Sequence, residues 1–563
     1  MNLRRILAVV IPALFAPVLL WAAATTVYPP HPKTSEMIAA ADLLARDQAV
    51  SDDVFQGRGP GTTAGEAAAQ WIADEMKRIG LKPGNHGSYF QNVPTVNIAL
   101  DAPKSSLTFN TPSGALSPSF PEQTVYWTPQ YSAADVTVTK SQLVFVGYGV
   151  VAPEYKWDDY AGLDVKGKTV VILINDPHNE ERPGDPAFFK GKAMTYYGRW
   201  TYKYEEAARH GAAAAIIVHE TGPAAYGWQV VRNSNSGNKL WLTTPDRNHS
   251  MVPVWGWITL DTAHDLFSKA GLDYDKLKAA ANQPGFKGVE MTGVTLDAHT
   301  HSNFKLLNTR NIIGIVPGIR RPNEFVLYTA HWDHLGVKPD VAGPDKIYNG
   351  AIDNGMGVSS ILEIGEAFAH SKPHPQRTVA IICWSLEEQG LLGSDYFAHH
   401  PIWPLNHIVG GVNLDGGLPH GHAHDLVLIG NGASEMEDIL AGVLKTQGRV
   451  ISPDPEPENG GFYRSDHISL SRVGVPMLDP AGASDLVVGG KDAAKAIRDD
   501  YRTNHYHQPS DEFDPKWDVT GVIDDLQALY TLGDTLANSD RWPNWYKDNE
   551  FRAIRDKSMK GRK

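Results

Sequence analysis

Carboxylate and imidazole side chains follow several apolar runs in the second half of the sequence. These residues are His331, Asp333, Asp353, Glu387, Glu388, Asp415 and His507. The apolar runs before them are typical of strands, and in open α/β sheets the ligand site lies beyond the carboxyl ends of the strands. We therefore expect these side chains to converge on one edge of a sheet, where carboxylates without a counter-charge would repel one another. A bound cation would remove that repulsion.

The residue types restrict which metal would bind. Two imidazoles with three carboxylates suit zinc or a similar borderline ion, whereas calcium or magnesium would favour oxygen ligands alone. The chain has one cysteine, Cys383, within the apolar run 379–384, which excludes a thiolate ligand set and any intrachain disulfide. We expect Cys383 to be a buried strand residue and not a nucleophile, since buried thiols behave as small apolar groups.

Five short strings, taken in order, carry a family resemblance. They are His331-Trp-Asp333, Asp353-Asn-Gly, Glu387-Glu388-Gln-Gly-Leu-Leu-Gly-Ser, Asn413-Leu-Asp415-Gly, and Tyr506-His507 with Asp511. The ordered set resembles the di-zinc aminopeptidase and glutamate carboxypeptidase family, the co-catalytic zinc exopeptidases, over about residues 35–125 and 304–545. The resemblance implies two Zn²⁺ ions as cofactors and a peptide as substrate.

The resemblance also implies which residues would hold the metals. Asp353 would bridge both zinc ions. His331 and Asp415 would complete one metal position, and Glu388 and His507 would complete the other. Two such ions carry four positive charges against three carboxylates, and a hydroxide would make the site neutral.

Three further residues would act beside the metals. Glu387 would be the general base, taking a proton from the activated water and passing it to the leaving amine. Asp333 resembles the carboxylate that fixes a ligand imidazole, and Tyr506 resembles the residue whose hydroxyl stabilises the tetrahedral oxyanion. His505 and His507 would share one face of an extended segment, so geometry leaves both open as ligands. The Tyr-His-x-x-x-Asp pattern selects His507.

Other polar residues near these motifs have two interpretations. Arg464 would either contact the substrate or lie at the surface. We expect six more histidines in loops, of which the last three would be able to line the cleft: His334, His399, His400, His420, His422 and His424.

The elements that position these residues alternate in type. From residue 311 we expect strands over 312–316, 325–330, 378–384, 408–414 and 426–429, and helices over 356–370, 435–446 and 522–537. This alternation predicts an α/β fold with a mainly parallel mixed sheet covered by helices on both faces, similar to the zinc exopeptidases.

The sequence pattern changes near residue 142. Here we expect strands over 143–146, 169–174 and 215–218, a helix over 202–210, and a β-rich end over 252–260 and 289–298. The strings Leu143-Val-Phe-Val-Gly-Tyr-Gly149 and Glu206-Ala-Ala-Arg-His-Gly-Ala212 resemble a protease-associated domain, which would shape or cover the substrate cleft. The predicted organisation is a signal peptide (1–24), a first segment of the peptidase domain (35–125), an inserted protease-associated domain (126–303), a second segment of the peptidase domain (304–545) and a C-terminal tail (546–563).

Composition and the N-terminus bear on partners and location. The formal net charge of −13 argues against nucleic-acid binding, which requires neutralisation of phosphates. Arg4 and Arg5 precede an apolar run over 6–21 and three alanines, the order of a secretory signal, which predicts export to the periplasm or the exterior. An uncleaved anchor helix is the alternative. No later segment is apolar enough to predict membrane association after cleavage, and the oligomeric state is not predicted.

The sequence thus predicts an exported zinc metallopeptidase, with aminopeptidase action preferred. A carboxypeptidase or dipeptidase of the same fold is the nearest alternative. A receptor-like protein without catalysis and a glutaminyl-cyclase-like protein with one zinc are further alternatives. The complete set of expected ligands and Glu387 argue against a receptor, and the Glu387-Glu388 pair and the inserted domain favour a peptidase over a cyclase.

Overall fold

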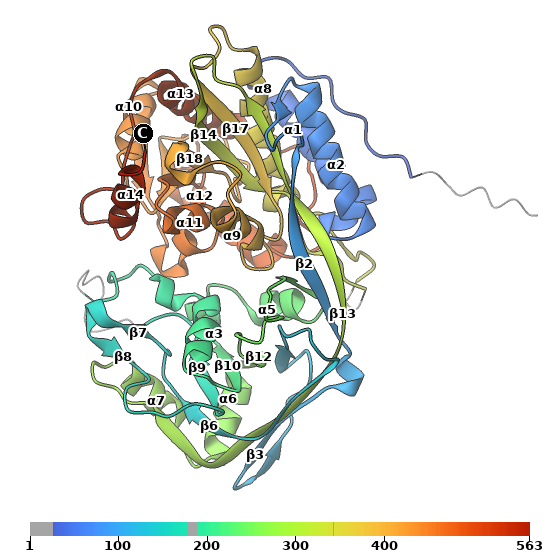
Figure 1. Cartoon of the computed structure of the whole chain (residues 1–563), viewed down its shortest axis with the longest axis vertical. Helices are drawn as coiled ribbons and strands as arrows, with labels where there is room; N and C mark the ends of the chain where they lie inside the picture. Colours follow the sequence, from blue (N-terminus) through green and yellow to red (C-terminus); the bar gives the residue numbers. More distant parts are fainter. Residues whose placement is uncertain (1–25, 178–187, 340, 342, 563) are drawn as a thin grey trace, which may run out of the picture.

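The computed structural model describes residues 26–177, 188–339, 341 and 343–562 (Figure 1). The predicted signal peptide, 1–24, lies outside these residues. Seventeen strands are linked by pairing into one mixed network, and helices pack against it. The α/β fold class predicted from the sequence is confirmed. No helix among the described residues has the length and apolar character needed to span a bilayer.

Parallel strands form the centre of the sheet that carries the candidate site. Strand β14 (Arg321–His331) lies between β17 (Arg377–Trp384) and β18 (Ile408–Asn413) and runs parallel to both. The next strand, β21 (Met477–Pro480), is parallel to β18. The apolar runs that predicted β14, β17 and β18 end within one residue of the observed strand ends, so the residues at these ends meet at one edge.

Helices cover both faces of this sheet. Alternate residues of a strand point to opposite faces, and Val326 and Tyr328 of β14 belong to one core cluster whereas Phe325 and Leu327 belong to another. The first cluster includes residues of α1 (Ala40–Val50), α2 (Thr63–Arg78), α8 (Met356–His370), α10 (Met436–Thr446) and α13 (Thr520–Asn538). The second includes residues of α9 (Leu392–His399) and α11 (His467–Arg472). Cys383 is buried in the first cluster, as expected for a strand residue.

The middle segment, residues 126–303, builds a second group of strands. Strand β9 (Thr169–Leu173) is parallel to β6 (Asp135–Phe145) and β10 (Ala214–His219), and β10 is parallel to β12 (Val254–Thr259). The helices of this segment are α3 (Trp200–Arg209), α4 (Thr221–Ala224), α5 (Trp228–Asn235), α6 (Leu260–Lys269) and α7 (Tyr274–Ala281). Two core clusters pack around these strands.

One long strand joins the two groups. Strand β13 spans Val289–Val316 and pairs with β6 at its beginning, with β2 (Phe90–Leu100) in its middle and with β17 at its end (Figure 1). The apolar runs predicted two separate strands here. The intervening residues bury small or polar side chains such as Thr300 and Ser302 on one face, so no apolar run marks them as a strand.

A short strand brings the middle segment toward the candidate site. Strand β11 (Lys239–Leu242) follows α5 and pairs antiparallel with β2. The remaining strands are β1 (Lys82–Pro83), β3 (Ser106–Thr111), β4 (Gly114–Leu116), β5 (Thr124–Trp127), β7 (Val151–Ala152), β8 (Trp157–Asp158), β15 (Gly336–Val337), β16 (Ile347–Tyr348), β19 (Asp425–Ile429) and β20 (Val450–Pro453), and the remaining α-helices are α12 (Gly490–Asp500) and α14 (Arg552–Met559).

Candidate active site

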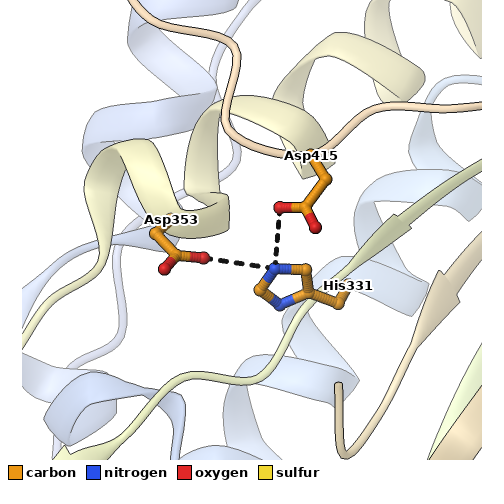
Figure 2. A group of neighbouring side chains, drawn as sticks. All are labelled: His331, Asp353 and Asp415. Carbon is orange, nitrogen blue, oxygen red and sulfur yellow. Dashed lines mark hydrogen bonds and ion pairs between the residues drawn. The ribbon is translucent and has the colours of Figure 1, made fainter. Parts of the chain in front are cut away.

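His331 is the last residue of β14 and is almost completely buried. Its Nδ1 lies 3.0 Å from the main-chain oxygen of Asp333. A neutral imidazole carries one N–H, and donation from Nδ1 leaves Nε2 with a lone pair. That Nε2 faces Asp353 Oδ1 at 3.2 Å and Asp415 Oδ1 at 3.1 Å (Figure 2). Three acceptor atoms therefore meet at one point, an arrangement that requires a cation or an added proton.

Asp353 presents its second oxygen to another histidine. Asp353 Oδ2 lies 3.3 Å from His507 Nε2, and the same nitrogen is 3.1 Å from Glu388 Oε2. The carboxylate of Asp353 thus lies between two imidazoles, one with Asp415 and one with Glu388. This is the shared position that the family resemblance implied for Asp353.

The donor atoms fit two zinc ions. Zinc bonds of about 2.0–2.2 Å in a tetrahedron place neighbouring ligand atoms about 3.3–3.6 Å apart, close to the separations of 3.1–3.3 Å found here. No Lys or Arg within the described residues forms an ion pair with Asp353, Glu387, Glu388 or Asp415. Imidazole with carboxylate is also the donor chemistry that zinc prefers. The residues therefore fit the metals that the sequence predicted.

The loop that carries Asp353 is fixed by Asp511. The backbone N–H groups of Ile352 and Asp353 donate to the two carboxylate oxygens of Asp511 at 2.9 and 3.1 Å. Tyr501 donates its hydroxyl to the same carboxylate at 3.1 Å. Asp511 thereby holds the loop before α8 in the conformation that turns Asp353 toward the two histidines.

Arg58 joins the loops of His331 and Asp353 and was not recognised as a site residue from the sequence. Its buried guanidinium donates to the main-chain oxygens of Trp332 at 2.8 Å, Asn349 at 2.5 Å and Gly350 at 2.7 Å. The neighbouring glycine permits this packing: a Cβ on Gly57 would lie 2.4 Å from the oxygen of Tyr348, so only glycine allows this close approach.

Asp333 and Glu387 contact each other through the backbone. The N–H of Glu387 donates to Asp333 Oδ1 at 3.1 Å, while Asp333 Oδ2 is buried with no hydrogen bond to a described residue. The imidazole of His331 is oriented by the carbonyl of Asp333, whereas the family resemblance implied its carboxylate in that place. Glu387 lies three residues after the end of β17, and the carboxylate of Asp333 holds the backbone of this turn.

Glu387 and Glu388 have opposite electrostatic environments. Burial raises the pKa of Glu387 well above its usual range, and the charges of Asp415 and Glu388 add to this effect. Its Oε2 lies 4.0 Å from His331 Nε2. Burial also opposes ionisation of Glu388, yet the adjacent imidazoles of His507 and His334 lower its pKa to about 2. One glutamate is therefore suited to exchange a proton and the other to remain a carboxylate.

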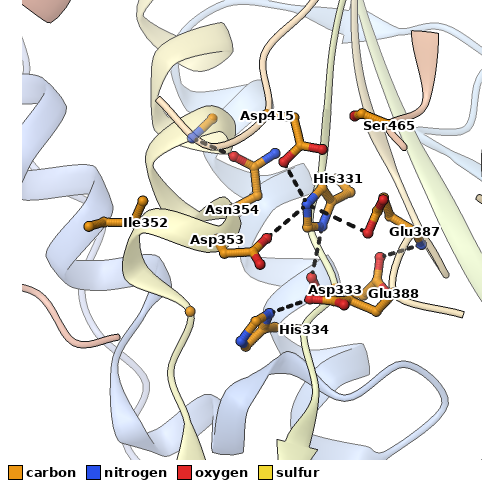
Figure 3. A network of polar contacts seen from close by, with 12 residues as sticks. His331, Asp333, His334, Ile352, Asp353, Asn354, Glu387, Glu388, Asp415 and Ser465 are labelled. Atoms are coloured by element: carbon orange, nitrogen blue, oxygen red, sulfur yellow. Dashed lines mark hydrogen bonds and ion pairs between the residues drawn. The ribbon is translucent and has the colours of Figure 1, made fainter. Parts of the chain in front are cut away.

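His334 is a second residue that the sequence motifs left outside the site. It lies in a loop, as expected, but it is buried, and its Nδ1 is 2.6 Å from Glu388 Oε1 (Figure 3). His334, Asp353 and Glu388 form one group with ligand atoms close enough to hold a metal ion, and His331, Asp353 and Asp415 form another. The separation of His334 and Glu388 along the chain gave no signal of this contact.

Tyr506 and His505 flank His507 in different ways. The ring of Tyr506 stacks on that of His507, with centroids 4.0 Å apart. His505 turns away, and its Nδ1 lies 3.0 Å from the Ser510 main-chain oxygen and 3.1 Å from Ser510 Oγ. Only His507 of the two histidines therefore faces Asp353 and Glu388.

A cavity of about 290 Å³ opens beside these residues. Its walls include Asp353, Glu387, Asp415 and Tyr506, and apolar residues such as Ile429. Arg464 lines it too, with its guanidinium above the ring of Tyr226 and donating to the Ala224 oxygen at 2.6 Å. The three histidines that were possible cleft residues, His420, His422 and His424, do not line this cavity. His420 contacts Asp525 and His422 contacts Asp524.

The part of the chain that carries every candidate site residue matches a known family. Residues 311–531 match the model of Peptidase family M28. The resemblance inferred from the sequence motifs is therefore confirmed for this part of the chain. Together with the imidazole and carboxylate donors, this match supports a zinc metallopeptidase.

Individual relatives align with a small part of the chain. The aminopeptidase NAALADL1 of Mus musculus is 27% identical over 139 residues, which are 23% of this chain and 17% of the mouse protein. A vacuolar membrane protease of Phaeosphaeria nodorum is 37% identical over 108 residues, 19% of this chain and 10% of that protein. The chain thus spans less than a fifth of the length of these relatives.

A solved structure shares the fold over most of the chain. The aminopeptidase from Aneurinibacillus sp. strain AM-1 superposes with a TM-score of 0.52 at 18% sequence identity, covering 90% of this chain and 96% of that protein. At this identity the similarity establishes the α/β fold, including the mixed sheet described above.

Proposed function

We propose that this protein is an exported exopeptidase that hydrolyses peptide bonds with a water activated by two zinc ions. The observation that carries the proposal is the pair of donor groups that share Asp353, within a peptidase domain. His331 and Asp415 would hold one ion with Asp353, and His507 and Glu388 would hold the other. His334 would be an additional donor beside Glu388.

Each remaining residue has a role in this proposal. When bound, zinc supplies Lewis acidity that lowers the pKa of water and polarises the scissile carbonyl. Glu387 takes a proton from the attacking water and delivers it to the amine that leaves, a role favoured by its raised pKa. The hydroxyl of Tyr506, at the wall of the cavity, donates to the developing oxyanion. Asp333 and Asp511 keep the loops of Glu387 and Asp353 in place.

Aminopeptidase action is the preferred direction. The mouse relative and the Aneurinibacillus protein of similar fold are both named aminopeptidases. Outside the metal positions the 290 Å³ cavity is lined by Asp454, Glu456 and Asp479 as well as by Arg464, Arg498 and Arg502. One of these carboxylates would pair with the free amino group of a substrate.

One observation favours the alternative of a carboxypeptidase or dipeptidase. Arg199 of the middle segment lines a smaller cavity with Glu387, Tyr506 and Arg464. Its side chain is only 9% exposed, and its guanidinium forms no hydrogen bond or ion pair with any described residue. A guanidinium with no such partner among the described residues would pair with the carboxyl end of a short peptide, since its fork matches carboxylate geometry.

Two further parts of the proposal concern location and organisation. The charged, apolar and small-residue order of the first 24 residues supports export to the periplasm or the exterior. Residues 126–303 would act as a protease-associated domain at the mouth of the site, since Arg199 and Tyr226 line its cavities.

A peptide panel tests the function and its direction. The purified full chain, loaded with zinc, would be given short peptides with free or blocked ends, and the released products identified by mass spectrometry. We expect hydrolysis when the amino end is free and none when it is acetylated. Cleavage that depends instead on a free carboxyl end would establish the alternative, and no cleavage of any peptide by zinc-loaded protein would contradict the proposal.

A further inference from the structure

The middle segment touches the second metal position through one hydroxyl group. Ser234, in the last turn of α5, places its Oγ 3.3 Å from His507 Nδ1. The other nitrogen of this ring, Nε2, is the atom that faces Asp353 and Glu388. Ser234 therefore contacts His507 on the side opposite to the carboxylates.

His507 Nδ1, the nitrogen in this contact, must carry the ring proton if Nε2 is to bind a metal. A neutral imidazole offers a lone pair at Nε2 only when its hydrogen lies on Nδ1, and an acceptor beside Nδ1 favours that tautomer. A serine hydroxyl has the acceptor lone pairs that the Nδ1–H group requires. Partners of this kind raise the affinity of a site because they fix both the tautomer and the orientation of the ligand ring.

Ser234 is itself held in place by Lys239. Lys239 donates its Nζ to the main-chain oxygen of Ser234 and to Asn235 Oδ1, each at 3.1 Å. Lys239 begins β11, which is paired with β2 from Lys239 to Leu242. The end of α5 is thus fixed to β11, which pairs with β2, and β2 pairs with β13, so Ser234 is anchored to the framework of the sheet.

Two neighbouring contacts support the same surface. Asn233 is buried and lies with its Nδ2 3.5 Å from the main-chain oxygen of His507. The N–H of Leu240 donates to Oε1 of Gln389 at 3.2 Å, and Gln389 is the residue directly after Glu388. His507 and Gln389, the residue after Glu388, therefore contact residues 233–240.

In the first metal position, the histidine is oriented by its own part of the chain and not by the middle segment. His331 Nδ1 is bonded to the carbonyl of Asp333, two residues away in its own loop. The partner of His507 lies 273 positions away along the chain, in a different group of strands. Placement of the middle segment against the sheet would therefore affect one metal position and leave the other unchanged.

We propose that Ser234 is a positioning residue of the second metal position, where its hydroxyl accepts the hydrogen bond of His507 Nδ1 and holds Nε2 toward Asp353 and Glu388. The inference rests on the proposed two-zinc function. It makes the middle segment part of the metal centre in addition to any role as a cover of the cleft.

Zinc titration of the full chain tests this role. The metal-free protein and its Ser234→Ala, Ser234→Thr and Ser236→Ala variants would be titrated with Zn²⁺ against a chromophoric chelator, and His507→Ala would identify the equivalent that belongs to the second position. For Ser234→Ala we expect affinity at that position to fall about 10–100-fold, with the other equivalent unchanged. Ser234→Thr retains a hydroxyl group and should keep a zinc affinity close to that of the wild type. Ser236 serves as the matched control because it is the next serine along the chain and, among the described residues, forms no hydrogen bond with His507.

The outcomes separate this inference from the proposed function. A wild-type protein that binds no zinc would contradict the proposed function itself. Two equivalents in the wild type, with unchanged affinities in Ser234→Ala, would overturn only the role of Ser234. Equal weakening of both equivalents would also overturn it, since it would indicate a general effect on folding.

Discussion

Two buried clusters of carboxylates in this protein are neutralised in different ways. In the arginine cluster, Glu75, Glu363 and Glu366 surround the fully buried side chain of Arg46, and Glu75 also binds Arg78. In the candidate active site, Asp353, Glu387, Glu388 and Asp415 meet only imidazoles within ion-pair distance among the described residues. The first cluster contains its own cations, and the second has donor atoms arranged for an external one.

The comparison separates a structural cluster from a catalytic one. Guanidinium groups link α1, α2 and α8 permanently, because they remain charged at any relevant pH. A site whose carboxylates meet only imidazoles gains its counter-charge from protons on those rings or from a bound ion, and both are removable.

Removal of metal should have the largest effect. Dialysis of the purified protein against a chelator should abolish peptide hydrolysis, and addition of Zn²⁺ should restore it, with close to two equivalents bound by elemental analysis. The melting temperature should also fall, because bound zinc stabilises only the folded chain. Full activity after complete removal of metal would show that the site carboxylates need no external cation.

Substitution of the proposed base should be the next largest effect. Glu387→Gln removes proton transfer and should lower kcat by about 10²–10⁴-fold. Both zinc equivalents should remain, since Glu387 is not among the proposed ligands. The variant would be compared with the wild type by steady-state kinetics and metal analysis, and turnover close to the wild-type value would eliminate Glu387 as the base.

The two neighbouring histidines should differ in metal content. His507→Ala should lose one zinc equivalent and most activity, because its Nε2 faces Asp353 and Glu388. His505→Ala should retain both equivalents, because its ring contacts Ser510. Metal analysis of both variants checks the assignment, which the reverse pattern would contradict.

The sequence predicted the candidate site residues better than the residues that hold them in place. His331, Glu387 and Asp415 follow apolar runs that became β14, β17 and β18, so strand ends placed them correctly at one edge. The contacts of Arg58 are with main-chain oxygens, which leave no residue pattern in the sequence. Ser234 and His334 touch the site only because distant segments meet, and spacing along the chain carries no record of that.

The fold also contains elements that the sequence predicted and elements that it did not. Buried strands with β-branched and aliphatic runs were predicted close to their observed bounds, as was α8 at Met356–His370. Strand β2 was not predicted: it contains Pro94 and polar residues among its apolar ones. The middle of β13 was missed for a related reason, since its buried face is lined by Thr300 and Ser302. Both strands depend on pairing with each other, which no local pattern records.

Loss of the central guanidinium should destabilise the protein without changing its chemistry. Arg46→Met leaves three carboxylates buried near one another, and removal of one partner from a buried ion pair costs about 3–5 kcal/mol. Urea unfolding should show this loss, while zinc content and kcat of the folded fraction stay unchanged. Lys104→Met, at an exposed ion pair with Asp101, is the matched control and should change stability little. A loss of zinc in Arg46→Met would show that the two clusters are not independent.

The smallest predicted effect is a pH dependence that belongs to the arginine cluster. Burial alone would raise the pKa of Glu75, yet hydrogen bonds from Arg78 and His31 and the charge of Arg46 lower it from the usual 4.5 to about 2. A carboxyl group with a lowered folded-state pKa adds stability that is complete above pH 4.5 and is lost as the pH falls toward 2. The shift corresponds to about 3 kcal/mol. Urea unfolding at a series of pH values should therefore show a wild-type advantage over Glu75→Gln that shrinks across this window. Glu36→Gln, at an exposed glutamate, should instead run parallel to the wild type. A constant difference between the wild type and Glu75→Gln down to about pH 2 would mean that the arginines do not hold Glu75 ionised.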